Sequence, residues 1–451
     1  MTGKRRSSSC NSKTTKKRNK PQQTKSAEKS ATNEEKVQLD YLIVEKIASL
    51  TELKFAPDLF QELVSSTFAK ALRSFYAEKK LTVSIDISYS EDANLDSEWP
   101  HITVLSVSGL SRQSKEEIKM DDDNNLNKAI ENIFARFPQI HLKIEGMDVV
   151  DSEEVACIIS DALNITRNVT IKTLEITSFY SVIIDCQRLI KKLARNLQVL
   201  NLHIYDPVDQ GQSSKRFWQT VNSCSKLAKL SVVTDYTLMM EETEDAFEAE
   251  NLLVVHITDC LKQLKIKHFR TNLQNGEEEE ERTMEWLISA FAENENLREL
   301  DVDTYFESGC YLGDLMNVED GPLVLSRLES LKIRSSDFDK HRTDWIPIVE
   351  KILTALSDRA ILKISVSYCK KDVGDILQMY LKISHRTART IKLRLLFWKK
   401  DAGAIATFET ALHQLSSVKE FRGLKTISYG KWTKLFYGNA NLMVKAHHGS
   451  V

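Results

Sequence analysis

The chain has 451 residues, of which 42% are hydrophobic and 28% charged, and its formal net charge is −2 at pH 7. This composition excludes disorder throughout, and the length exceeds one compact core of ordinary size, so several domains or a repeat array is expected. No run reaches the roughly 18 apolar residues of a membrane span, and the first residues lack the hydrophobic core of a secretory signal. We therefore expect a protein of the nucleus, the cytoplasm or both, without a membrane partner.

Glycine and proline are scarce, with 14 and 7 residues. Their scarcity disfavours a many-stranded all-β fold and favours substantial helix. The seven cysteines are odd in number, widely separated, and include no Cys-x-x-Cys pair. This spacing indicates reduced, structural thiols rather than a disulfide framework.

Residues 1–35 have the composition of a disordered basic tail. They hold ten Lys and Arg against three Glu and no aromatic residue, so they cannot form a core. Removing them from the 62 basic and 64 acidic residues of the chain leaves 52 and 61, a formal charge of −9 for the rest. A tail of charge +7 therefore precedes an acidic body.

Two basic clusters lie in this tail, separated by about ten residues. They resemble a bipartite nuclear-import signal, which implies an import receptor as a partner, and the candidate residues are Lys4, Arg5, Lys16, Lys17, Arg18 and Lys20. The alternative is a generic solubilising or phosphate-contacting tail. No aromatic residues interleave with the charges, so sequence-specific nucleic-acid binding is not expected.

Residues 36–80 show no strand pattern, and their apolar residues recur at helical spacing. Three short helices are predicted there, with apolar positions at Leu39, Leu42, Ile43, Ile47, Leu50, Leu59, Phe60, Leu63, Val64, Phe68 and Leu72. One interpretation is a helical cap that shields the first strand of the following array from solvent.

Part of this pattern resembles a degenerate F-box, most specifically over residues 64–68. In that family the motif docks on a Skp-type ubiquitin-ligase adaptor, which would make the contacting residues Leu39, Ile43, Ile47, Leu59, Phe60, Val64 and Phe68. Two positions depart from the family, because Asp40 stands where it prefers proline and Leu42 where it prefers glutamate.

Residues 81–430 alternate short apolar runs with longer stretches of helical periodicity. The runs have period-two or L-x-x-L-x-L spacing, and their anchors recur every 26 to 37 residues at Leu105, Leu142, Leu174, Leu200, Leu230, Leu264, Leu300, Leu331, Ile364, Leu393 and Phe421. Such an interval accommodates one strand, one helix and two turns. Helices are predicted over 125–137, 152–163, 184–195, 216–224, 283–294, 345–358, 372–386 and 404–416.

The repeated spacing resembles the leucine-rich-repeat family. That resemblance implies an α/β solenoid with parallel strands on one face, helices on the other, and a core buried only by stacking neighbours. The family usually places Asn or Cys after the last apolar strand position, whereas this chain has Tyr205, Asp235, Phe269, Tyr305 and Ser336. The repeats should therefore be irregular, and an open pair of α/β domains is the alternative.

No catalytic motif is present. The chain lacks a Gly-x-x-x-x-Gly-Lys phosphate loop, Gly-x-Gly-x-x-Gly, His-Glu-x-x-His and Gly-x-Ser-x-Gly, so neither a cofactor nor a metal is expected. His447 and His448 lie in residues 431–451, which we expect to be a polar C-terminal tail. Acidic runs at 121–123 and 277–281 are expected to favour helix starts or solvated loops.

Candidate contacts to a partner are aromatic residues near predicted strand ends, Tyr205, Phe269, Tyr305 and Tyr368, although each fits a core or turn position equally well. Three hypotheses follow: an F-box-like substrate receptor of a ubiquitin ligase, a nuclear or cytoplasmic repeat scaffold without a ubiquitin role, and an unrecognised enzyme. The sequence favours a non-catalytic protein that binds another protein.

Overall fold

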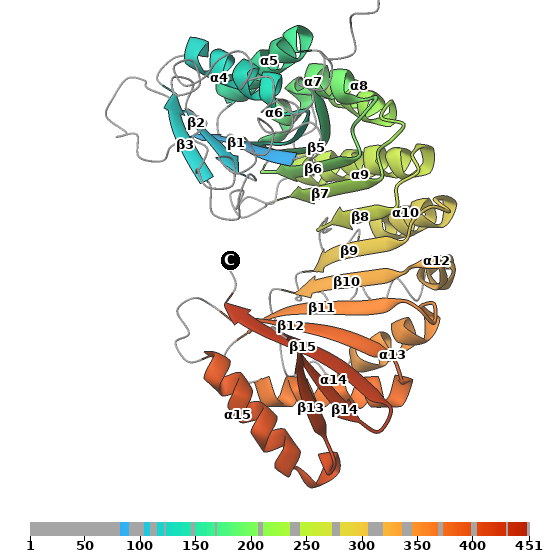
Figure 1. The fold of residues 1–451 in the computed structure, drawn as a ribbon. Coiled ribbons are helices and arrows are strands. Elements are labelled where there is room, and N and C mark those ends of the chain that lie inside the picture. The colour runs from blue at the N-terminus through green and yellow to red at the C-terminus, as the bar shows by residue number, and fades with distance from the viewer. Residues whose placement is uncertain are drawn as a thin grey trace, which may run out of the picture.

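The structure is a computed structural model in which a long array of strands is accompanied by helices (Figure 1). The described residues are 82–89, 103–108, 115–120, 123–145, 149–166, 169–205, 211–234, 244–272, 280–304, 319–335, 345–368, 373–397, 404–429 and 432–448. They form one sheet of fifteen strands in the order β13-β14-β15-β12-β11-β10-β9-β8-β7-β6-β5-β4-β1-β2-β3.

The strands are short, as expected for units of one strand and one helix. They are β1 (Thr82–Tyr89), β2 (Thr103–Ser108), β3 (Lys115–Met120), β4 (Gln139–Glu145), β5 (Thr170–Ser178), β6 (Val199–Ile204), β7 (Lys229–Thr234), β8 (His268–Thr271), β9 (Glu299–Thr304), β10 (Ser330–Ser335), β11 (Ile361–Tyr368), β12 (Thr390–Phe397), β13 (Lys425–Tyr429), β14 (Trp432–Tyr437) and β15 (Ala440–His448).

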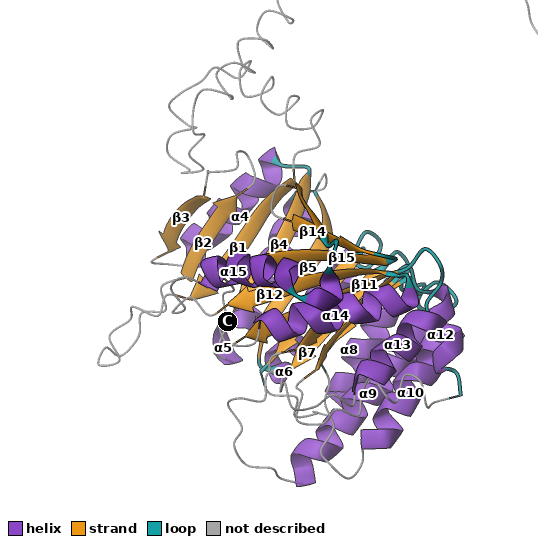
Figure 2. Ribbon diagram, turned by 90° about the horizontal axis from the view of Figure 1, so that it is seen from below, coloured by secondary structure: helices purple, strands orange, loops and turns teal. Residues whose placement is uncertain are grey.

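Helices connect most of the parallel strands. They are α4 (Asp123–Arg136), α5 (Val149–Ile165), α6 (Tyr180–Asp185), α7 (Gln187–Leu193), α8 (Gln212–Asn222), α9 (Glu244–Gln263), α10 (Glu280–Glu293), α12 (Gly321–Arg327), α13 (Trp345–Ala355), α14 (Val373–Thr387) and α15 (Ala404–Ser417), with a 3-10 turn, η1 (Lys419–Phe421). Successive helices from α7 to α15 pack against one another, so they form a layer along one side of the strands (Figure 2).

The core is built from apolar side chains in register across the sheet. One buried residue from each of the strands β4–β12 and β15 joins a continuous row: Leu142, Leu174, Leu200, Leu230, Phe269, Leu300, Leu331, Leu362, Ile391 and Leu442. Each fully buried side chain of this size contributes up to about 1.5–3 kcal/mol. Because each strand meets only its neighbours, the core is elongated and has no single centre.

The repeated strand–helix pattern and the mostly parallel sheet confirm the coarse prediction of a solenoid-like α/β fold. Strands β4–β12 pair in parallel with their neighbours, and β1 and β15 extend the parallel run at its two ends. The alternative of two separate open domains is not supported, since the described strands belong to one sheet.

The two ends of the sheet differ from the prediction because they are antiparallel. The run around Leu105 was expected to begin the parallel array, but it forms β2, which pairs antiparallel with β1 and with β3. At the other end β13, β14 and β15 form an antiparallel meander. Terminal units of a repeat array lack one neighbour, so a different pairing there covers the last parallel strand.

Residues 431–451 are not the polar tail that we expected, because two strands lie within them. Leu442 and Val444 alternate with polar or exposed positions at the strand period, and both are buried beside the matching residues of β12. His447 and His448 are therefore the last residues of β15.

The last predicted strand, anchored at Phe421, is not formed. Val418 precedes Phe421 by three positions, an apolar spacing that suits a helical turn as well as a strand. Val418 is the N-cap of η1, and Phe421 is its last residue. Phe421 is buried, with its ring centroid 5.3 Å from that of Tyr437.

The helix predictions differ from the structure at one predicted helix and at two helices that were missed. The helix expected over 184–195 begins earlier, at Tyr180, and is divided at Cys186 into α6 and α7. The helices α9 and α12 were not predicted at all.

Candidate functional site

Six strands at the C-terminal end of the sheet, β10–β15, carry basic residues and no acidic ones. Their sequences contain no Asp or Glu and eight Lys or Arg: Lys332, Arg334, Lys363, Lys392, Arg394, Lys425, Lys434 and Lys445. We call these eight residues the basic face.

The eight residues share the side of the sheet that is opposite the helices. Side chains alternate between the two sides of a strand, and the buried residues Leu331, Leu362 and Leu442 face the helix layer. The cations occupy the intervening positions, so they face away from the helices.

Strand pairing aligns the cations in two rows. The first row contains the register partners Lys332, Lys363 and Lys392 on three adjacent strands. It continues through Met443 on β15 to Lys434 on β14. Two residues further along the strands, a second row runs through Arg334, Ser365, Arg394 and Lys445. Adjacent strands lie about 4.8 Å apart, so the charges of a row form a dense ladder.

Six of the eight cations have no ion-pair partner in the described part of the chain. They are Lys363, Lys392, Arg394, Lys425, Lys434 and Lys445, all of them half-buried or exposed. Lys434 Nζ lies 4.5 Å from the ring centroid of Phe436, the described aromatic side chain on this face. Ile427, which is 46% exposed, adds an apolar position beside it.

Asp301 on β9 marks the border of the basic face. Its Oδ2 is 3.0 Å from Lys332 Nζ and 2.9 Å from Arg334 Nη2, and its side chain is only 8% exposed. Burial opposes ionisation of this carboxyl, but attraction by Arg334 and Lys332 outweighs it and lowers the Asp301 pKa. The pKa of Lys332 is also lowered, because burial and repulsion by Arg334 and Arg270 outweigh the attraction of Asp301.

The other half of the same strand face carries acidic and neutral polar side chains as well as basic ones. Asn201 Nδ2 donates to Glu175 Oε2 at 3.2 Å, and His268 Nδ1 lies 3.5 Å from Glu299 Oε2. Burial is the main cause that lowers the pKa of both His141 and His268, so these imidazoles are neutral at pH 7. Acidic residues of β5 and β9 therefore lie in that half of the sheet, whereas β10–β15 carry none.

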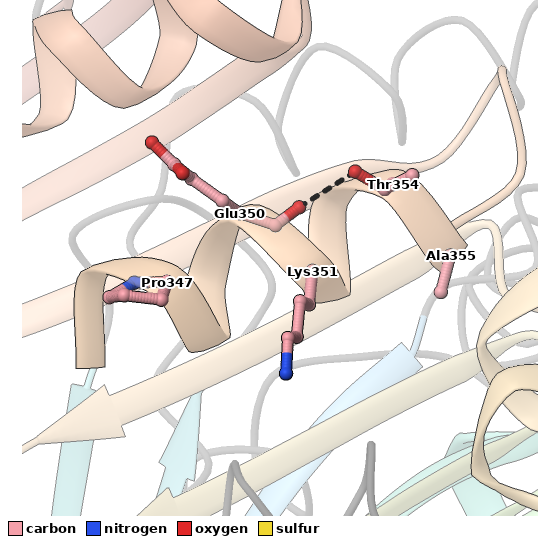
Figure 3. A pocket seen from close by; sticks show the side chains of 5 residues that line it. All are labelled: Pro347, Glu350, Lys351, Thr354 and Ala355. Carbon is pink, nitrogen blue, oxygen red and sulfur yellow. Dashed lines mark hydrogen bonds between the residues drawn. The ribbon is translucent and has the colours of Figure 1, made fainter. Parts of the chain in front are cut away.

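A hollow of about 470 Å³ lies along α13, and Figure 3 shows the residues that line it. All of them come from this helix: Pro347, Glu350, Lys351, Thr354 and Ala355. Thr354 Oγ1 donates to the Glu350 carbonyl at 2.9 Å, and the Glu350 carboxylate pairs with Arg386 at 3.0 Å. The Thr354 hydroxyl and the Glu350 carboxylate are therefore both engaged by other groups.

Two buried thiols are unsuited to act as nucleophiles at neutral pH. Burial raises the pKa of Cys224 to about 12 and raises that of Cys260 well above its ordinary value. A thiol reacts as its thiolate, so both remain unreactive while the helices stay packed. Within the described ranges, no group of three or more His, Cys, Asp and Glu side chains is placed to hold a metal ion, and no helix has the length and apolar composition of a membrane span.

The site residues predicted from the sequence lie outside the described residues. This holds for the import candidates Lys4, Arg5, Lys16, Lys17, Arg18 and Lys20, and for the adaptor candidates Leu39, Ile43, Ile47, Leu59, Phe60, Val64 and Phe68.

Three of the aromatic candidates lie in the described residues, and Tyr368 is the last residue of β11. Phe269 is fully buried in the core row. It therefore has the core role and does not contact a partner at the surface. Tyr205 is half-buried, with its ring centroid 5.2 Å from that of His203 and 6.2 Å from that of Phe179.

Sequence reasoning missed the basic face, although a signal was present. The runs Leu331 to Arg334, Leu362 to Ser365 and Ile391 to Arg394 each alternate apolar and polar residues, with lysine at the second position. The apolar members of these runs are sufficient to locate the strands, so the prediction did not depend on the lysines between them.

Comparisons with known proteins do not assign the chain to a family. No protein-family model matches it, and no curated protein matches its sequence. Among solved structures, a structural-genomics protein of Bacteroides fragilis aligns with a TM-score of 0.29 and 8% identity, covering 61% of this chain and 87% of that one. A likeness at this score carries no argument about function.

Proposed function

We propose that this chain is a non-catalytic protein-binding repeat protein and that it holds its partner on the strand face of β10–β15. The observation that carries the proposal is the basic face, with eight cations, no acidic residue on the six strands, and six cations without an ion-pair partner in the described residues. Like charges at this density repel one another, so a surface of this kind is stabilised by an anionic partner.

The position of the face suits binding. It lies on rigid strands whose opposite side is locked into the core, so the cations are presented with little freedom of the backbone. Partly buried side chains, such as Lys332 and Arg334 at 20% and 30% exposed, are also less screened than fully solvated ones. Complementary charge then contributes to both the rate and the specificity of association.

Charge reversal on the basic face is expected to abolish partner capture. The variant carries Lys363→Glu, Lys392→Glu and Arg394→Glu, and crosslinking in cells followed by quantitative mass spectrometry measures the proteins recovered. Recovery should fall at least about tenfold, because each substitution replaces an attraction by a repulsion.

The matched control carries Lys215→Glu, Lys351→Glu and Arg359→Glu. It makes the same change of charge at exposed residues away from the strand face, in α8, in α13 and before β11. This control should recover the wild-type set of partners. Identical recovery by all three proteins would show that the strand face is not the binding surface.

The finer proposal is an F-box-like substrate receptor, in which the segment 36–80 recruits a Skp-type adaptor while the repeat face holds the target. It is supported by the resemblance of residues 64–68 and by the place of that segment directly before a repeat array. The alternative is a repeat scaffold without a ubiquitin role, carried to the nucleus by its basic tail or retained in the cytoplasm.

Adaptor recruitment separates these two proposals. We expect the wild-type chain to co-purify with a Skp-type adaptor, and Leu59→Asp, Val64→Asp and Phe68→Asp together to remove it, because the contact would be apolar. The basic-face variant should keep the adaptor, since it leaves the segment intact. If the wild-type chain recruits no adaptor, the segment is a cap and the scaffold alternative holds.

A further inference from the structure

We infer that the basic face receives an extended segment of the partner in which acidic side chains alternate with uncharged ones. This inference rests on the proposed function and adds the chemical class of the bound segment. Lysine and arginine on the face call for carboxylates, because opposite charges attract at these short distances.

The dimensions of the face suit a short peptide. Six strands spaced by about 4.8 Å extend over about 24 Å, which about seven residues of extended chain cover at about 3.4 Å each. An extended chain shows every second side chain to one side, so three or four carboxylates would face the sheet. Six cations that have no ion-pair partner among the described residues are available to receive them.

Charge favours a short peptide over a duplex nucleic acid. A duplex carries about one negative charge per 1.7 Å, or about fourteen over the length of the face, which exceeds the eight cations present. The rest of the body is acidic, since the chain without its first 35 residues has a formal charge of −9 from 52 basic and 61 acidic residues. A long polyanion would therefore meet repulsion beyond the face, whereas a short acidic segment would not.

The test uses fluorescence anisotropy with the full chain and a labelled peptide of about seven residues in which glutamate alternates with threonine. At about 0.1 M salt, wild type should bind this peptide, and the neutral variant Lys363→Gln, Lys392→Gln, Arg394→Gln should bind it at least about tenfold more weakly. The control Lys215→Gln, Lys351→Gln, Arg359→Gln should match wild type, and a peptide with glutamine for glutamate should not bind. Circular dichroism verifies that each variant is folded.

Three outcomes would overturn the inference. They are no binding of the acidic peptide by wild type, equal binding by the basic-face and control variants, and tighter binding of an oligothymidine of about twelve nucleotides than of the peptide. If the peptide does not bind but partner capture still depends on the basic face, only this inference is wrong. The partner would then present a folded acidic surface. If neither peptide binding nor partner capture depends on the basic face, the proposed function is wrong as well.

Discussion

Replacing Phe269 by alanine is expected to lower the free energy of unfolding by about 3–5 kcal/mol. Phe269 is fully buried in the middle of the apolar row, between its register partners Leu230 on β7 and Leu300 on β9. Its ring centroid lies 5.5 Å from that of Phe291 on α10, so the side chain joins the strand layer to the helix layer. Urea denaturation followed by circular dichroism measures the loss.

The control is Phe269→Leu, which matches the leucines on both sides and should cost less than about 1.5 kcal/mol. Because each unit of a solenoid contacts only its neighbours, hydrogen exchange should show the loss of protection mainly in β7, β8 and β9. Equal loss in β12 and β15 would contradict a quasi-linear array and indicate a single cooperative core.

The strands of the middle of the array were predictable because their signal is local. Leu200 and Leu202 of β6, like Leu331 and Ile333 of β10, alternate at the strand period within an L-x-x-L-x-L run, and all four are buried. This alternation depends only on the chain's own geometry. The parallel arrangement was expected from the resemblance to leucine-rich repeats.

The unit around β8 was misplaced because a helix imitates the same spacing. The predicted anchor Leu264 follows Leu261 by three positions, but Leu261 lies in the last part of α9, where this spacing is helical. The true strand has Phe269 as its inward anchor and begins at His268. Because this anchor is an aromatic residue and most of the others are leucines, a search for the leucine pattern does not find it.

The basic face could not be predicted from any single strand, because register decides it. Lys363 and Lys392 are 29 positions apart in the sequence, yet they are partners on adjacent strands. Register is set by pairing and by the packing of the apolar row, and neither is visible in one repeat. Lys445 was missed for a further reason, since its strand was taken for part of a tail.

Replacing Asp301 by asparagine is expected to lower the free energy of unfolding at pH 7 by about 2 kcal/mol. The change keeps the shape of the side chain and removes the charge that holds Lys332 and Arg334 together. Their side chains are 20% and 30% exposed, so solvent screens part of the resulting repulsion and keeps the loss below that of a fully buried pair.

The pH dependence of this loss has a definite sign. The Asp301 pKa is lowered in the folded protein, so the carboxylate stabilises the fold at every pH above its ordinary value of 3.8 and loses that contribution as the pH falls through the folded pKa. The difference between wild type and the asparagine variant should be constant from pH 7 to about 5 and shrink below about pH 4. A difference that grows on acidification would contradict the assignment.

The same substitution should strengthen binding to the acidic peptide while it weakens the fold. Asp301 neutralises part of the charge of Lys332 and Arg334, and without it both become available to a carboxylate of the ligand. We expect a gain of about threefold in affinity, which corresponds to one exposed ion pair of about 0.6 kcal/mol. Stability and affinity then change in opposite directions, which a general unfolding of the face would not produce. Weaker binding by a folded asparagine variant would show that Asp301 orients the cations rather than competing for them.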